Sequence, residues 1–315
     1  MASILLNLLV FIISFVFIWL GSGLIITSVD KISRKLKVSS FAFSFFLLGI
    51  LTSIPEISVS LAALSEGKPE IFVGTLIGEI IVIFFLIIPF LAFFGNGIKF
   101  TNKIEPHTLI FAFVVLLTPL VAVLDKTITT TESVFMIILA SVLFFVIQKH
   151  KGILDGNTEM MHLKRYSIHD LLRILAGIGI VLVASNLIVN KTIFFADLLS
   201  IPEFFIGLII LGVGTSLPEI TLAFRAIAEK KKDVALGNYL GSATTNVVVL
   251  SIMIMLSGGN VMTVNSFWKT LMIAVVGFAM FYHFTKSKDD LSKREGAILL
   301  LVYVAFLILE GTIIL

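Results

Sequence analysis

Long apolar runs, separated by short polar breaks, make up most of the chain. A helix of about 20 apolar residues spans the hydrocarbon core of a bilayer, and runs of this length recur throughout the sequence. The pattern therefore predicts an all-α membrane protein with ten transmembrane helices, at residues 3–28, 38–65, 70–95, 106–124, 132–149, 168–189, 200–228, 233–257, 264–284 and 294–314. The longest polar break, residues 150–167, is interpreted as a linker between two five-helix halves, 1–149 and 168–315.

Composition agrees with this pattern. Hydrophobic residues make up 58% of the chain and charged residues 14%, whereas a soluble domain carries about 25% charged residues. Lipid is therefore the expected solvent. The absence of Cys excludes thiolate metal sites, disulfides and a Cys nucleophile. Because the apolar N-terminus lacks a basic leading region and a small-residue cleavage site, we interpret it as the first spanning helix.

The distribution of positive charge predicts the orientation of the helices. Alternate polar breaks carry 18 of the 23 Lys and Arg residues, and the other breaks carry four. Positively charged breaks stay in the cytoplasm, so both termini are expected outside it, in a multi-pass protein of the cell membrane. The same residues lie between apolar runs and indicate no nucleic-acid partner. Lipid is the expected environment, and we expect the chain to function as a monomer without a bound cofactor.

The two halves repeat one motif at a constant offset. Adding 163 converts Thr52-Ser53-Ile54-Pro55-Glu56 into Thr215-Ser216-Leu217-Pro218-Glu219. The same offset relates Gly49 to Gly212, and the glycines of 74–78 to those of 237–241. Since each half has an odd number of predicted helices, the second half enters the membrane from the opposite side. The sequence therefore predicts inverted repeats.

Each copy of the motif predicts an interrupted helix in mid-membrane. Pro55 and Pro218 each remove a backbone donor and free a carbonyl upstream. Inside a bilayer, an interrupted backbone is tolerated only where it is buried in protein or lines a cavity. A second glycine-rich helix follows in each half, where small residues permit close helix approach and could allow a further local break.

The polar groups near these interruptions are hard oxygen ligands. Glu56 and Glu219 would each cost several kcal/mol in a bilayer unless paired or ion-bound, and the sequence shows no Lys or Arg at the same predicted depth. A mobile cation is the natural counter-charge. Calcium takes six to eight oxygen ligands, and sodium can use the same oxygens. The residues that share helix faces at a spacing of four are Thr52 with Glu56, Thr215 with Glu219, Glu79 with Ile83, and Ser242 with Asn246.

The paired motif resembles the two alpha-repeats of the sodium/calcium exchanger family, within the calcium/cation antiporter superfamily. The residues that carry the resemblance are 214–219 with 237–242, and 52–56 with 74–78. The resemblance covers essentially the whole chain and is closest to prokaryotic-type members, because the 150–167 break is too short for a regulatory domain. It implies an antiporter that exports calcium by admitting sodium through alternating access, with helices one and six as a sliding gate.

The resemblance also implies roles for individual residues. Glu56 and Glu219, with Thr52 and Thr215, would hold the divalent ion. Flanking sodium sites would use the hydroxyls of Ser53, Ser216 and Ser242 and the carbonyls of Gly49 and Gly212, and Asn246 is a further candidate ligand. For the hydroxyl residues, hydrogen bonding back to the helix around the Pro kink is the competing structural interpretation.

The second hairpin of the first repeat departs from the family pattern. The family has a small hydroxyl residue where this chain has Glu79, and an amide or acid where it has Ile83. The site thus gains a potential charge and loses a polar ligand. Because three neighbouring carboxylates repel one another, we expect Glu79 to hold a proton part of the time when no divalent ion is bound. It could replace one sodium site or couple transport to protons.

Three other functions stay open at this point. A proton-coupled or other-cation antiporter is suggested by Glu79 and Ile83. A cation channel is a weaker alternative, because paired carboxylates between two gates argue against an open pore. An intramembrane hydrolase would need a nucleophile with a base, or a metal cluster, and the repeated motif supplies neither. The sequence therefore indicates a transporter and not an enzyme.

Overall fold

The computed structural model describes residues 2–33, 49–99, 105–150, 168–229, 232–263, 267–288 and 290–314. The first half contains α1 (Ala2–Ser33), α3 (Gly49–Thr52), α4 (Ile54–Ser65), α5 (Pro69–Val82), the π-helix η2 (Ile83–Ile87), α6 (Ile88–Phe94), α7 (Pro106–Ala122), the short 3-10 helix η3 (Val123–Asp125) and α8 (Thr130–His150). The second half contains α9 (Ile168–Leu199), α10 (Glu203–Ile206), the π-helix η4 (Gly207–Leu211), α11 (Gly212–Thr215), α12 (Leu217–Glu229), α13 (Lys232–Leu256), α14 (Trp268–Lys288) and α15 (Lys293–Ile314).

Helices account for nearly all of the described chain, as the apolar pattern predicts. Each of the ten predicted ranges contains helix, although the start of the second range and nearly all of the 150–167 linker lie outside the described residues. Seven helical segments within the described residues are long and apolar enough to cross a membrane: Ile4–Ile25, Pro69–Phe94, Pro106–Asp125, Thr130–Ile147, Leu172–Leu199, Glu203–Thr221 and Tyr239–Leu256. The chain is therefore a membrane protein with several spanning helices.

Among the described helices, the largest error in a predicted boundary is at the end of the sixth helix. The sequence placed the end of the sixth helix at residue 189, but α9 continues to Leu199. The polar residues Asn190 and Lys191 interrupt the apolar pattern, yet neither breaks a helix, and Asn190 Nδ2 donates to the Asn186 carbonyl within the helix. The helix ends only before Ser200, which has a positive φ of 54°, and Pro202.

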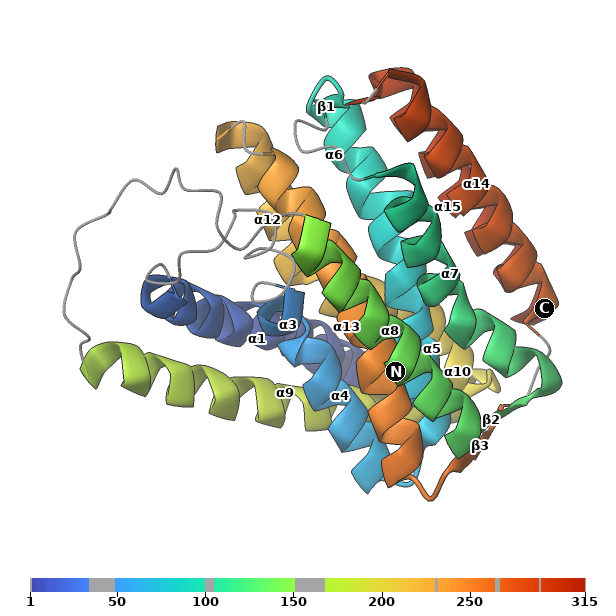
Figure 1. The fold of residues 1–315 in the computed structure, drawn as a ribbon. Helices are drawn as coiled ribbons and strands as arrows, with labels where there is room; N and C mark the ends of the chain where they lie inside the picture. Colours follow the sequence, from blue (N-terminus) through green and yellow to red (C-terminus); the bar gives the residue numbers. More distant parts are fainter. Residues whose placement is uncertain are drawn as a thin grey trace.

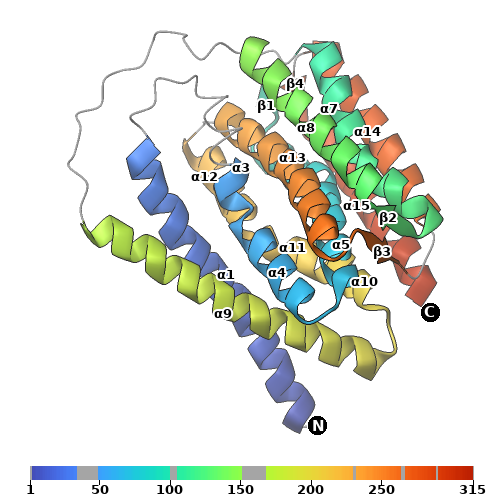
Figure 2. The same cartoon turned by 60° about the horizontal axis from the view of Figure 1, so that its bottom comes forward.

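The helices α1 and α9 form a pair that lies along one side of the bundle (Figures 1 and 2). They cross at two glycines: a Cβ on Gly177 would lie 2.7 Å from the Gly21 carbonyl oxygen. A side-chain hydrogen bond joins this pair to the remaining helices, from Trp19 Nε1 to Thr221 Oγ1 in α12 at 2.7 Å.

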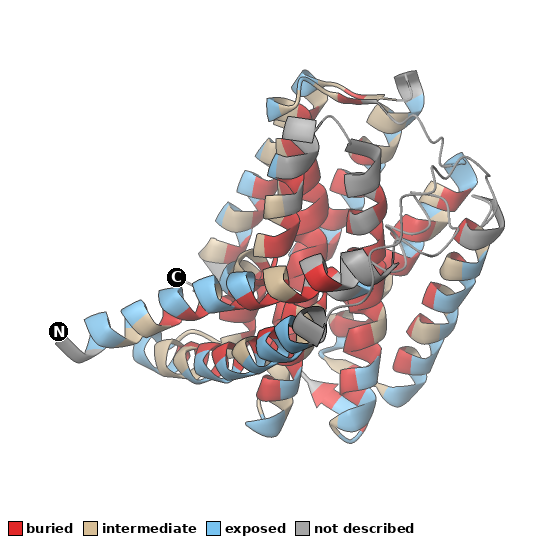
Figure 3. Cartoon of the chain, turned by 90° about the vertical axis from the view of Figure 1, so that its left-hand side faces the viewer, coloured by how far each residue is buried: buried red, intermediate tan, exposed pale blue. Residues whose placement is uncertain are grey.

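The interior of the bundle is formed by α5 and α13. Every residue of α5 from 71 to 82 is buried, and Figure 3 shows the buried residues concentrated in the inner helices while exposed residues cover the outer faces. An aromatic cluster closes one side of this core, where Phe84 of η2 lies edge-on to Phe113 of α7 and to Phe278 and Phe281 of α14. The two central helices are thus shielded from lipid along most of their length.

Two short antiparallel strand pairs, which the sequence pattern does not predict, join loops of the two halves. Strand β1 (Ile98–Lys99) pairs with β4 (Asp290–Leu291), with Ile98 opposite Leu291. Strand β2 (Thr127–Thr129) pairs with β3 (Asn260–Met262), with Ile128 opposite Val261. The two pairs lie at opposite ends of the bundle (Figures 1 and 2).

Candidate cation site

Both copies of the repeated motif interrupt a helix at the Ser. In the first copy, α3 ends at Thr52, Ser53 has a φ of −80° and a ψ of 7°, and α4 begins at Ile54. In the second copy, α11 ends at Thr215, Ser216 has a φ of −74° and a ψ of 11°, and α12 follows. The interruptions predicted from the Pro residues are therefore confirmed. The second glycine-rich segments differ, because α5 and α13 run through 74–78 and 237–241 without a break.

The hydroxyl groups at the interruptions bond back to their own helices. Ser53 Oγ donates to the Gly49 carbonyl at 2.9 Å, and Ser216 Oγ donates to the Gly212 carbonyl at 2.7 Å. Thr215 Oγ1 likewise donates to the Leu211 carbonyl at 2.9 Å. These bonds occupy the donors but leave the hydroxyl oxygens able to accept or to ligate. Hydrogen bonding back to the helix, the competing interpretation of these hydroxyl groups, is therefore present. It leaves their oxygens able to bind an ion as well.

Three carboxylates meet at the centre of the bundle. One carboxylate oxygen from each of Glu56, Glu79 and Glu219 lies within 4.8 Å of the others, and all three side chains have no exposed surface. They come from α4, α5 and α12, so residues far apart in sequence converge on one point. The Glu79 carboxylate, which the sequence singled out as a departure from the family pattern, is a full member of this cluster.

Hydroxyl groups connect the carboxylates. Ser242 Oγ in α13 lies 3.3 Å from Glu79 Oε1 and 3.2 Å from Glu219 Oε1, in positions to donate to either. Ser53 Oγ lies 3.1 Å from Ser242 Oγ. Thr52 also bonds the Glu219 side chain. Four helical segments from both halves therefore supply one continuous group of oxygens.

Much of this group makes no hydrogen bond. Both oxygens of Glu56, Oε2 of Glu79 and Oε2 of Glu219 are buried without a hydrogen bond of regular geometry, and so are both amide atoms of Asn246. The side chains of Glu56 and Asn246 both interact with Glu79. The described side chains contain no ion pair to any of the three carboxylates. Burying unpartnered carboxylates costs several kcal/mol each. Such a cluster is chemically suited to a cation with oxygen ligands, the divalent class above all.

Two glycines allow the helices to converge. A Cβ on Gly49 would lie 2.6 Å from the Gly241 carbonyl carbon and 2.8 Å from the Ser242 nitrogen. A Cβ on Gly212 would lie 3.0 Å from the Gly78 carbonyl carbon and 3.1 Å from the Glu79 nitrogen. Both positions need glycine because backbone packs on backbone there. Each contact holds the segment preceding one interruption against a residue of the carboxylate cluster.

Two of the candidate ligands make no described hydrogen bond to the carboxylate cluster, and one residue outside the candidates does contact it. Thr215 and Ser216 make the hydrogen bonds to their own helix and border the cluster without a described bond to a carboxylate. Tyr239, to which the sequence gave no role, is fully buried, and its hydroxyl donates to the Glu219 carbonyl oxygen at 3.1 Å. The sequence alone could have identified Tyr239, because it lies three residues before Ser242 and residues at this spacing share a helix face.

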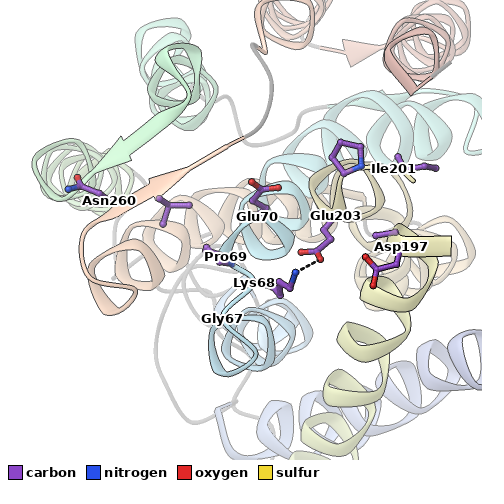
Figure 4. Close-up of a pocket in the computed structure, with 11 residues that line it drawn as sticks. Gly67, Lys68, Pro69, Glu70, Asp197, Ile201, Glu203 and Asn260 are labelled. Atoms are coloured by element: carbon purple, nitrogen blue, oxygen red, sulfur yellow. Dashed lines mark ion pairs between the residues drawn. The ribbon is translucent and has the colours of Figure 1, made fainter. Parts of the chain in front are cut away.

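A separate cavity of about 510 Å³ lies at the ends of α4 and α9, away from the carboxylate cluster (Figure 4). Acidic side chains line it, including Glu70, Asp197 and Glu203. The Lys68 ammonium lies 2.7 Å from Glu203 Oε1, and the hydrogen bond to Glu203 raises the pKa of Lys68 above its usual value. This ion pair connects the first half to the start of α10.

Comparison with known proteins agrees with these observations. The family described as sodium/calcium exchanger protein matches residues 6–148 and 169–310. The sodium/calcium exchanger MaX1 of Methanosarcina acetivorans is 24% identical, and the match covers 96% of this chain and 97% of that protein. The inner membrane protein YrbG of Escherichia coli is 24% identical, with 73% of this chain and 75% of that protein covered.

Solved structures share the fold. The sodium-calcium exchanger NCX_Mj superposes with a TM-score of 0.68 at 22% identity, over 96% of this chain and 97% of the other. The H⁺/Ca²⁺ exchanger CAX superposes with a TM-score of 0.76 at 13% identity, over 98% of this chain and 84% of the other. Since the family match extends across both halves, the chain belongs to the sodium/calcium exchanger protein family, a family of transporters and not of enzymes.

Proposed function

We propose that this protein is a secondary active antiporter that exports calcium in exchange for sodium, with the ion held by Glu56, Glu79 and Glu219. One observation carries the proposal: three buried carboxylates meet within 4.8 Å, with four of their oxygens unpartnered. A divalent cation supplies the missing charge and accepts several oxygens at once. Cation antiport is supported independently by the names of similar proteins, which are a sodium/calcium exchanger and an H⁺/Ca²⁺ exchanger.

The remaining candidate ligands follow from the same arrangement. Thr52 and Thr215 would complete the divalent site. Sodium, which needs less charge, would use the hydroxyls of Ser53, Ser216 and Ser242 with the carbonyls of Gly49 and Gly212. Each of these two carbonyls already lies within 3 Å of a Ser hydroxyl, so oxygens of both kinds are close together. Asn246 would serve as a neutral ligand beside Glu79.

The proposal includes two inverted five-helix repeats and ten spans, with both termini outside the cytoplasm. Several contacts support the inversion through the offset of 163. It converts the strand contact Ile98–Leu291 into Val261–Ile128, which is the register of the other strand pair at the opposite end of the bundle. It also converts the contact of Gly49 with Gly241 into that of Gly212 with Gly78. A two-fold axis in the membrane plane accounts for both relations.

Alternating access in this proposal is movement of the α1–α9 pair over the carboxylate-bearing helices. Support comes from the way the pair packs on itself through Gly21 and Gly177 while lying along one side of the bundle. Phe15 of α1 contacts Gly214, just before the second interruption. Displacement of α1 would therefore change access to the site directly.

Calcium flux in proteoliposomes tests the function. Outward sodium gradients should drive calcium uptake by the native protein, and Glu219→Gln, which keeps the shape but removes the charge, should reduce uptake to background. Calcium flux that does not depend on a counter-ion gradient would indicate a channel. Full activity of the Gln variant would remove the cluster from the mechanism.

A proton is the second candidate counter-ion, and the position of Glu79 favours it. Without a divalent ion, three ionised carboxylates would repel one another, so a proton on Glu79 would lower the charge of the calcium-free site and would leave when calcium binds. Calcium uptake should then respond to an imposed pH gradient in the native protein and lose that response in Glu79→Ser. An unchanged dependence on both gradients in the variant would contradict proton coupling at Glu79.

A further inference from the structure

Glu79 and Ser242 occupy equivalent positions in the two halves, since 79 plus 163 is 242. Their side chains are also in contact, because Ser242 Oγ lies 3.3 Å from Glu79 Oε1. When a two-fold axis relates two residues that touch, the axis must pass close to their contact. The pair therefore lies at the centre of the site, on the line about which the two halves are related.

The surroundings of the two positions are matched. Gly212 packs its backbone against Glu79, and Gly49 packs its backbone against Ser242. Ser242 Oγ lies 3.2 Å from Glu219, and the Glu79 carboxylate belongs to the cluster that contains Glu56. The same two-fold relation exchanges Glu56 with Glu219. Each member of the pair thus has one of these carboxylates as its neighbour and a glycine behind its backbone.

We propose that the third carboxylate of the cation site can be supplied from either side of the axis, so that Glu79 and Ser242 form one exchangeable carboxylate–hydroxyl pair. This inference rests on the proposed function. What the ion requires is one carboxylate and one hydroxyl across the axis, in either order. Two carboxylates would add a buried charge, and two hydroxyls would leave the divalent ion with less negative charge to bind it.

One neighbour breaks the symmetry. Asn246 lies close to Glu79, whereas its equivalent in the first half is Ile83, which is fully buried and apolar. A carboxylate moved to position 242 would therefore lose its amide neighbour. Exchanging Ile83 and Asn246 as well would restore that neighbour and rotate the whole polar arrangement about the axis.

The test is a cycle of variants in proteoliposomes, with calcium uptake and calcium-dependent thermal stabilisation both measured. Glu79→Ser and Ser242→Glu should each reduce uptake by about tenfold or more, and the double exchange should recover most of that loss, as coupled sites in a double-mutant cycle do. The fourfold exchange, with Ile83→Asn and Asn246→Ile, should recover more than the double exchange. A pair with a merely structural role would recover thermal stability in the double exchange without recovering calcium uptake or calcium-dependent stabilisation.

A double exchange no better than Glu79→Ser would overturn the inference, and so would failure of both exchanged proteins to yield monodisperse material, because exchangeability requires both positions to accept either side chain. An inactive native protein would instead contradict the proposed function. The stabilisation measurement separates the two cases, since it reports calcium binding without requiring transport.

Discussion

Gly49 in α3 and Gly241 in α13 bring two helices into direct backbone contact beside the carboxylate cluster, where a Cβ on Gly49 would lie 2.6 Å from the Gly241 carbonyl carbon. An added Cβ would overlap the backbone of α13, which cannot move aside as a flexible side chain can. We therefore expect Gly49→Ala to force α3 away from α13 and to destabilise the protein by about 1–3 kcal/mol, the usual cost of overpacking.

Thermal unfolding in detergent and calcium uptake measure this effect. Gly23→Ala is the matched control, because a Cβ there meets nothing within 4 Å and alanine favours a helix over glycine. The control should be as stable as the native protein or slightly more so, with normal uptake. Equal stability of the two variants would contradict the close approach of α3 and α13.

Glu310 in α15 is a buried carboxyl group outside the carboxylate cluster. It is 1% exposed and accepts a hydrogen bond from the Thr270 hydroxyl in α14, while its Oε2 has no hydrogen-bond partner. Thr270→Val should leave the group without this donor and destabilise the protein by about 1–3 kcal/mol. Thr270→Ser keeps a hydroxyl and should be milder.

Because Glu310 is not one of the three convergent carboxylates, Glu310→Gln should leave calcium uptake close to the native rate. Uptake by the folded Gln variant in proteoliposomes checks this. A loss as severe as that expected of Glu219→Gln would mean that the transport path extends to α15.

The sequence predicted the helical architecture and the two interruptions because both depend on local chemistry. Apolar runs determine where helices form in lipid, and Pro55 and Pro218 determine where the two helices are interrupted. The offset of 163 also pointed to Glu56, Glu219 and Ser53, and the family resemblance pointed to Ser242. These residues lie together, as a repeated motif around a shared centre requires.

Other features depend on contacts between distant segments and could not be predicted. The strand pair of Ile128 with Val261 has no sequence signal beyond a few residues of loop. The bond of Tyr239 to the Glu219 carbonyl depends on how α12 meets α13. The end of α9 was misplaced because Lys191 resembled a loop charge, although a helix can carry a polar residue near the membrane surface.

The Lys68–Glu203 ion pair at the acidic cavity should contribute little to stability, and its contribution should depend on pH in a defined direction. The Lys68 side chain is 41% exposed, so solvent screens the pair to about 1 kcal/mol or less. Its pKa is raised by the bond to Glu203. The stabilisation is therefore fully present below the ordinary Lys value of 10.5 and is lost as pH rises through the raised value.

A double-mutant cycle with Lys68→Met and Glu203→Gln measures this coupling. We expect a small favourable coupling free energy at pH 8 that disappears at strongly alkaline pH. A coupling free energy that grows as pH rises would show that the pair does not act through the Lys68 charge. Glu70→Gln gives a graded comparison, because Glu70 lines the same cavity and acts on Lys68 through its charge without forming the ion pair. Its coupling to Lys68 should be smaller than that of Glu203.

Glu56 should make the protein less stable until a cation binds. Both of its carboxylate oxygens are buried without a hydrogen bond of regular geometry, and two further carboxylates lie within 4.8 Å. In calcium-free buffer, Glu56→Gln should therefore unfold at a higher temperature than the native protein, by an amount equivalent to about 1–3 kcal/mol.

Addition of calcium should reverse the order of stability of the native protein and Glu56→Gln. A ligand at 100 times its dissociation constant stabilises by about 2.7 kcal/mol, and the variant has lost the charge that binds calcium. Thermal unfolding with and without calcium, with magnesium as the control cation, checks both parts. A native protein that is more stable than the variant in calcium-free buffer would mean that Glu56 is satisfied by other groups and that its role is structural.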